Sequence, residues 1–143
     1  MTATARLESI RADFEMLDEW EDRYRYLIEL GKDLAPLDEG DRTDTNKVRG
    51  CASQVWLATR IEPHPDGPRL HFKGDSDAHI VKGLIAIVFA MFDGQPAKDI
   101  GGIDAHAIFA EMGLAGHLTP QRSNGFAAMV SRIRSDAEVA LAA

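Results

Sequence analysis

Cysteine is almost absent from this chain of 143 residues, which contains only one, Cys51. A single cysteine excludes an intramolecular disulfide and a metal site built from several thiolates. Gly50 precedes it and a β-favouring segment follows it. This placement suggests a sulfur presented for chemistry, because a thiolate can attack, accept an atom and pass it on. On composition alone, a lone cysteine is more often an inert small hydrophobic residue.

Positive charge is also scarce, since 16 Lys and Arg residues stand against 23 Asp and Glu residues, for a net charge of −7. Nucleic acid and anionic membranes repel such a chain, so we expect proteins or small molecules as partners. The longest apolar run, residues 84–92, is far shorter than the roughly 20 residues that span a bilayer. The N-terminus shows no signal-peptide core. We therefore expect a cytoplasmic protein, folded as one domain over residues 1–143.

The spacing of apolar residues predicts most of the helices. Residues 7–17 and 20–34 have amphipathic helical patterns, and residues 78–92, apolar on nearly every face, are predicted to form the central helix of the core. A shorter helix is expected near residues 105–112. Thr119 as N-cap and Pro120 in the first helical position predict a last helix, whose alanine-rich tail, 137–143, is expected to fray.

Two strands, residues 53–61 and 69–73, are predicted to form a hairpin with an exposed, proline-rich connection over residues 63–68. The loop 35–46, rich in Pro, Gly, Asp and Thr, leads to the cysteine. Residues 74–77 are predicted to open the central helix, with Asp and Ser side chains accepting hydrogen bonds from its free amide groups. A metal-binding role for this acidic cluster is less favoured than capping.

Several residues could support chemistry at Cys51. Gly50 permits unusual backbone angles, and Lys47 and Arg49 carry positive charge on the same loop, which would favour a thiolate. Arg122, in the first turn of the last helix, is unfavourable for the helix dipole. This cost could be tolerated for a contact with an anion or a partner, or Arg122 could simply be a solvated surface arginine.

Other site chemistries have little support in the sequence. The five histidines form no close metal-binding pair, and no Cys-x-x-Cys or His-Glu-x-x-His spacing is present. Cys51 could form a hydrolase dyad with a distant histidine. No oxyanion-hole motif surrounds it, however, so we favour this interpretation less.

Four segments form a wider pattern and follow one another in order: Arg23–Gly31, Val48–Trp56, Gly74–Leu84 and His117–Gly125. Together they resemble the SufE and CsdE family of sulfur-acceptor proteins over almost the whole chain. Four motifs in matching order are much more specific than any one of them. The resemblance implies an α+β fold, in which a small antiparallel three-stranded sheet packs against several helices, similar to the cluster scaffold IscU.

The resemblance also implies a function. Cys51 would accept persulfide sulfur from a cysteine desulfurase of the SufS or CsdA type, stimulate that desulfurase, and pass the sulfur to an iron–sulfur scaffold complex of the SufBCD type. The chain would be an accessory protein and not an enzyme. It would need no metal or cofactor of its own, because the pyridoxal phosphate belongs to the desulfurase. We expect Cys51 to be sheltered when idle and to swing out on Gly50 as a hinge after docking.

The resemblance further implies a set of residues near the cysteine loop or the desulfurase interface. Arg122 could stabilise a sulfur anion, whereas Asp75 and Asp77 could do no more than cap the central helix. The supporting or partner-binding residues are Gly50, Ser53, Gln54, Trp56, Asp75, Asp77, His117 and Arg122.

Two other functions stay open at this point. The chain could be a noncovalent activator or binding module of a desulfurase, with a structural Cys51. Less favoured is a free-standing thiol enzyme or redox sensor. The sequence also leaves open a homodimer, the resting burial of Cys51 and the pKa of its thiol.

Overall fold

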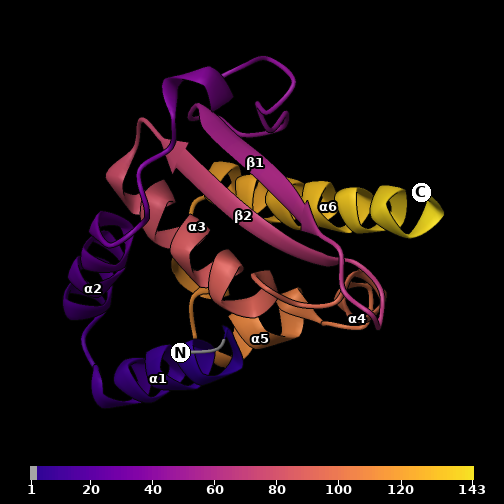
Figure 1. Cartoon of the computed structure of the whole chain (residues 1–143). Coiled ribbons are helices and arrows are strands. Elements are labelled where there is room, and N and C mark those ends of the chain that lie inside the picture. Colours follow the sequence, from indigo (N-terminus) through magenta and orange to yellow (C-terminus); the bar gives the residue numbers. More distant parts are fainter. Residues whose placement is uncertain (1–2) are drawn as a thin grey trace.

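A long antiparallel hairpin crosses the upper half of the computed structural model, which describes residues 3–143 (Figure 1). Strand β1, Val55–Glu62, pairs with β2, Arg69–Ser76, in a register that runs from Val55 opposite Ser76 to Glu62 opposite Arg69. The proline-rich residues 63–68 connect the strands. The fold is α+β, as predicted, but within residues 3–143 the sheet has two strands and not three.

The segment before the cysteine loop forms only the beginning of a third strand. Lys47 makes an isolated bridge to Trp56, and the N–H of Val48 donates to the carbonyl oxygen of Val55 at 2.8 Å. The pairing stops because the chain turns at residues 43–46 on one side and at Gly50, whose φ is +92°, on the other. A left-handed backbone angle of this kind cannot continue a strand.

The second strand is longer than the sequence predicts, because it continues through residues 74–76 instead of ending at Lys73. These residues therefore do not open the central helix. That helix, α3, spans His79–Phe92, and its N-cap Ala78 has no side-chain cap. The N–H of Ala78 instead donates to the Ser76 hydroxyl at 3.2 Å, outside the helix.

Helix α3 forms the core of the molecule, as predicted. Every residue in it except His79 and Lys82 is buried, and it contacts helices α1, α2 and α6 and strand β2. Helix α1 spans Ala3–Met16 and α2 spans Trp20–Lys32. The backbones of α2 and α3 approach closely, since a Cβ on Gly83 would lie 2.1 Å from the carbonyl oxygen of Leu27.

Within residues 3–143, five further elements complete the fold, and the longest of them, α6, is hydrogen-bonded to strand β1 through Asp136 and Arg132. They are the short helices η1 (Glu39–Asp41), α4 (Ala97–Ile100), α5 (Ala105–Glu111) and η2 (Ala115–His117), and the long helix α6 (Pro120–Ala142). Thr119 caps α6, as predicted, by accepting a hydrogen bond from the N–H of Arg122 at 3.3 Å. The predicted fraying is wrong, because α6 is helical to Ala142 and buries Ala137 and Ala140.

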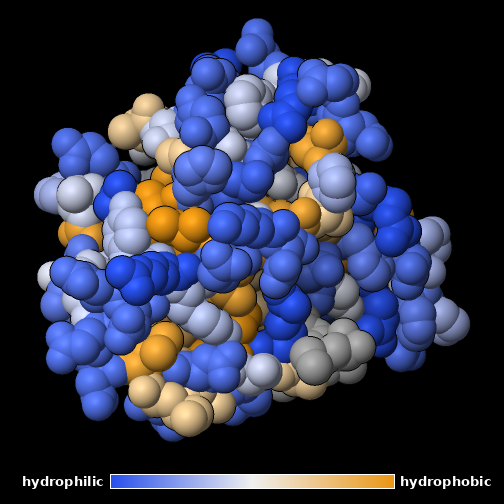
Figure 2. Space-filling view, turned by 90° about the vertical axis from the view of Figure 1, so that its left-hand side faces the viewer, coloured by the Kyte–Doolittle hydropathy of each residue, from blue (hydrophilic) through white to orange (hydrophobic). Residues whose placement is uncertain are grey.

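The surface is mainly polar. Figure 2 shows the face on the left-hand side of Figure 1, where hydrophilic residues predominate and hydrophobic residues show between them in small areas. In the part of the chain that the structure describes, no helix is both long and apolar enough to cross a membrane.

Candidate functional site

Cys51 lies on a short loop, residues 49–54, that is closed at its base. The hydrogen bond from Val48 to Val55 joins the two ends of the loop. Gln54 and Asp77 exchange two further bonds: the N–H of Gln54 donates to the Asp77 carboxylate at 3.1 Å, and the N–H of Asp77 donates to the Gln54 carbonyl at 3.4 Å. Asp77 therefore anchors the cysteine loop and does not cap α3, which corrects the prediction of helix capping.

The Cys51 side chain is half-buried and points towards helix α6. Its Sγ lies 3.7 Å from the carbonyl oxygen of Gly125, to which the S–H donates a long, weak hydrogen bond. Gly125 is buried, and a Cβ at this position would lie 3.5 Å from Sγ. The glycine thus keeps the surface of α6 flat where the sulfur rests.

A cavity of about 30 Å³ adjoins Cys51 between the loop and helices α3 and α6. Its walls are largely apolar and come from buried side chains of the two helices. The lining residues are Ala52, Ser53, Val81, Leu84, Gln121, Arg122, Gly125, Phe126 and Met129. The structure thus brings Ser53 and Arg122, both predicted from the sequence, to the same cavity as Cys51.

Burial raises the pKa of the Cys51 thiol above its ordinary value. The charged thiolate loses hydration in such a place, so the neutral form is favoured. The expectation that Lys47 and Arg49 would favour the thiolate is therefore wrong for this conformation, in which desolvation decides the direction of the shift.

Arg122 is held by an aromatic side chain from a distant helix. Its Nη2 donates to the hydroxyl of Tyr24 on α2 at 3.5 Å, and its Cζ lies 5.8 Å from the centroid of the Tyr24 ring. His117 is exposed and does not line the cavity, but it stacks on Trp20, whose ring in turn meets Tyr24 edge-on. Sequence reasoning did not assign Tyr24 to the site, although it lies in a matched segment.

Asp75 and Trp56 belong to a different cluster. They are opposite each other across the two strands, and neither lines the cavity beside Cys51. Asp75 forms ion pairs with Arg42 and, at 3.5 Å, with Lys82, and the Arg42 guanidinium lies 5.2 Å from the Trp56 ring centroid. No sequence pattern indicated Arg42, because it lies in a loop without periodicity.

The charges around Asp75 also set its acidity. Burial would raise the pKa of this carboxyl, but hydrogen bonds from Arg42 and from the N–H of Ser76, with the charges of Lys82 and Arg42, lower it below its ordinary value. Asp75 is therefore an ionised anchor for the loop 35–46 and, like Asp77, does not cap α3.

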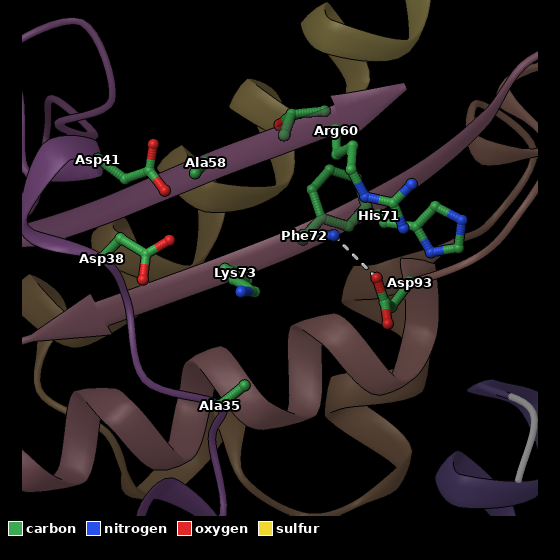
Figure 3. Close-up of a pocket in the computed structure, with 10 residues that line it drawn as sticks. Ala35, Asp38, Asp41, Ala58, Arg60, His71, Phe72, Lys73 and Asp93 are labelled. Atoms are coloured by element: carbon green, nitrogen blue, oxygen red, sulfur yellow. Dashed lines mark hydrogen bonds between the residues drawn. The ribbon is translucent and has the colours of Figure 1, made fainter. Parts of the chain in front are cut away.

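A larger cavity, of about 490 Å³, lies on the other side of the hairpin (Figure 3). Asp38 and Asp41, near η1, lie along one side of it, and Arg60 and His71 come from the strands. Its lining residues include neither the predicted site residues nor a nucleophilic sulfur. Size therefore does not identify the reactive site here, and we place the site at the smaller cavity because Cys51 lines it.

The described part of the chain has no evident metal centre. Within residues 3–143, no three or more His, Cys, Asp and Glu side chains are grouped so that they could hold a metal ion. For chemistry, the residues around Cys51 offer a thiol, a guanidinium and an apolar cavity.

Comparisons with known proteins agree with the sequence pattern. The sequence model of the SufE family, described as an Fe-S metabolism associated domain, matches residues 8–137. An uncharacterized SufE-like protein of Rhizobium etli is 56% identical over 139 residues, which cover 97% of this chain and 94% of that protein. An uncharacterized SufE-like protein of Rhizobium meliloti is 56% identical over 132 residues, covering 92% and 94% of the two chains.

A solved structure shares the fold. The solution structure of a hypothetical protein from Thermus thermophilus matches the whole of both chains with a TM-score of 0.76 at 19% sequence identity. At that identity the likeness concerns the fold alone.

Proposed function

Because the chain belongs to the SufE family of Fe-S metabolism associated domains, we propose that it is a sulfur acceptor that takes persulfide sulfur from a cysteine desulfurase onto Cys51. The observation that carries this proposal is the position of the only cysteine, on a closed loop beside a cavity of about 30 Å³. The protein is an accessory of Fe-S metabolism. Its action on a desulfurase and a scaffold complex is part of the proposal.

The transfer is a thiol exchange in which one sulfur atom changes partner. Cys51 loses its proton to solvent, and its thiolate attacks the terminal sulfur of the donor cysteine persulfide. The new S–S bond forms at Cys51 as the old one breaks. The donor cysteine leaves as a thiolate and takes up a proton, so no external oxidant or reductant is consumed. Delivery to the scaffold repeats this exchange with Cys51 as donor.

The small cavity supports the carrier role. Its volume of about 30 Å³ exceeds the roughly 10–15 Å³ that a cavity needs to hold one water molecule. It therefore has room for one added sulfur atom. Apolar walls from Leu84, Phe126 and Met129 also disfavour the ionised thiols that would strip the persulfide.

The loop supports release of the sulfur after docking. Among residues 3–143, the sulfur makes one hydrogen bond, the long contact with Gly125, so little is lost when the side chain leaves the cavity. Gly50, at a positive φ, supplies backbone freedom next to Cys51. The bonds at Val48 and Gln54 fix the two ends, so the opening is confined to the residues between them.

The partners follow from the same proposal. The desulfurase is of the SufS or CsdA type and holds the pyridoxal phosphate that releases sulfur from cysteine. The recipient is a scaffold complex of the SufBCD type, and this chain itself requires no cofactor. A noncovalent activator is the second candidate. The raised pKa and half-burial of Cys51 favour it, because both also fit a cysteine that only packs.

Intact mass measurement separates the two candidates. We expect the chain, after incubation with desulfurase and cysteine, to gain about 32 Da, the mass of one sulfur, and to lose it on reduction. The matched control is Cys51→Ser, which should gain nothing and stimulate the desulfurase poorly. The carrier proposal fails if the wild-type chain gains no sulfur and Cys51→Ser stimulates fully, which would favour the noncovalent activator. Turnover of a small thioester without any desulfurase would instead support a free-standing thiol enzyme.

A further inference from the structure

Helix α2 contributes Tyr24 to the cysteine site, where this residue contacts Arg122. Tyr24 accepts a hydrogen bond from Arg122 at 3.5 Å and presents its ring 5.8 Å from the Arg122 guanidinium carbon. Arg122 in turn lines the cavity beside Cys51. We infer that Tyr24 is a positioning residue that holds Arg122 at the cavity lined by Cys51, an inference that rests on the proposed function.

Arg122 needs such support because its place in α6 is unfavourable. It lies in the first turn of the helix, where the positive end of the helix dipole repels a cation. Within residues 3–143, no carboxylate forms an ion pair with Arg122, so acidic side chains do not offset this cost. The ring and hydroxyl of Tyr24 do, through a cation–π contact and a hydrogen bond.

The ring of Tyr24 is itself held by a row of aromatic side chains. Trp20 meets it edge-on, with ring centroids 6.4 Å apart and planes at 69°. His117 stacks on Trp20, with ring centroids 4.5 Å apart and planes at 17°. The row thus runs from η2 across α2 to α6. It connects His117 to the cysteine site although His117 does not line the cavity.

This arrangement matters at the moment when the sulfur becomes an anion. In the exchange, negative charge develops on Cys51 before attack and again when the persulfide gives up its sulfur. An Arg122 side chain that Tyr24 already holds at the cavity needs less ordering before it stabilises that charge. A mobile Arg122 would instead be hydrated and available only part of the time.

The test compares three tyrosine variants in two backgrounds. Tyr24→Leu removes the ring and hydroxyl, Tyr24→Phe removes the hydroxyl alone, and Tyr26→Phe is the matched control. Tyr26 lies on the same helix, and its hydroxyl donates to Asp13 at 2.5 Å. Each is made in the wild-type chain and in Arg122→Gln, and the rate of sulfur transfer from the desulfurase is measured.

In the wild-type background we expect Tyr24→Leu to slow the transfer roughly threefold to thirtyfold, the range of a partly desolvated cation–π contact, and Tyr24→Phe to slow it less. Tyr26→Phe should not alter the rate. In Arg122→Gln, Tyr24→Leu should cause no further loss. Equal slowing in both backgrounds would overturn the inference, because Tyr24 would then act on general structure and not through Arg122.

A second readout does not depend on sulfur transfer. The ring current of Tyr24 should shift the NMR signal of the Arg122 side-chain N–H, and Tyr24→Leu should move this signal to that of a free arginine. An unchanged signal overturns the inference. If the wild-type chain accepts no sulfur, the proposed function fails, and the NMR signal alone then decides whether Tyr24 holds Arg122.

Discussion

Burial beside Gly125 favours the protonated form of Cys51, because the thiolate would lose hydration there. This places the sulfur in a different state from that of the reactive cysteines that helix dipoles or cations keep ionised. In the resting chain, loss of hydration beside the apolar cavity sets the direction of the pKa shift of Cys51. Burial against α6 therefore disfavours ionisation of the resting thiol.

The raised pKa gives a prediction for the isolated protein. At any given pH the thiolate fraction is smaller than that of an ordinary cysteine, so Cys51 should react slowly with iodoacetamide at neutral pH. The alkylation rate should rise with pH, and its curve should lie at higher pH than the curve of the unfolded chain. The measurement is the alkylation rate by intact mass between about pH 6 and 10. The urea-unfolded chain is the control, and a folded curve at or below the unfolded one would contradict the prediction.

For single residues, the sequence predicted which side chains lie at the site better than it predicted what each side chain does. Cys51, Ser53 and Arg122 do lie together, whereas the roles assigned to Asp75 and Asp77 as helix caps are wrong. A side chain can cap a helix only if the helix's first backbone N–H groups lie within its reach. Here β2 continues through Gly74 and Asp75, residue types that usually weaken strands, and α3 begins only at His79. The contact between Tyr24 and Arg122 joins α2 to α6, and no local pattern along the chain indicates it.

Among the elements, helices α2 and α3 pack so closely that there is no space for a side chain at Gly83. Gly83 faces the backbone of α2, and a Cβ there would lie 2.1 Å from the Leu27 carbonyl oxygen. Since a backbone atom cannot rotate away, Gly83→Ala must push the two helices apart. Periodicity predicted both helices, but it contains no information on how closely two helix axes approach.

We therefore expect Gly83→Ala to lower the free energy of unfolding by at least about 2 kcal/mol, through overpacking. Denaturation in urea measures it. Gly101→Ala is the matched control, because a Cβ there meets nothing within 4 Å and the backbone is helical, with φ −64°. Equal stability of the two variants would show that the helices can separate at little cost.

Element boundaries were harder to predict than the elements themselves. The helices 20–34, 78–92 and 105–112 were predicted close to their observed bounds, because apolar spacing reports directly on the buried face. The extension of β2 to Ser76 depends instead on the partner strand, since Val55 and Trp56 provide the pairing. The tail of α6 is ordered by packing of Ala137 and Ala140, which propensity alone does not reveal.

For the molecule as a whole, the core is organised around α3. This helix contacts three other helices and the sheet, so its amides cannot open without most of the structure. Hydrogen exchange should therefore be slowest in α3, with opening free energies equal to that of global unfolding. Exchange measured by NMR in increasing denaturant tests this, and the loop 49–54 is the internal comparison. Exchange in α3 that is as fast as in that loop would refute it.

The closed base of the cysteine loop also limits how far the sulfur can travel. Cys51 follows Val48 by three residues, and three extended residues span at most about 10 Å. In the proposed transfer, if the bond between Val48 and Val55 persists, the sulfur stays on a short tether and never crosses a wide gap between proteins. Each handover then requires the donor or recipient cysteine to come within that radius, so geometry alone excludes partners that bury their sulfur more deeply.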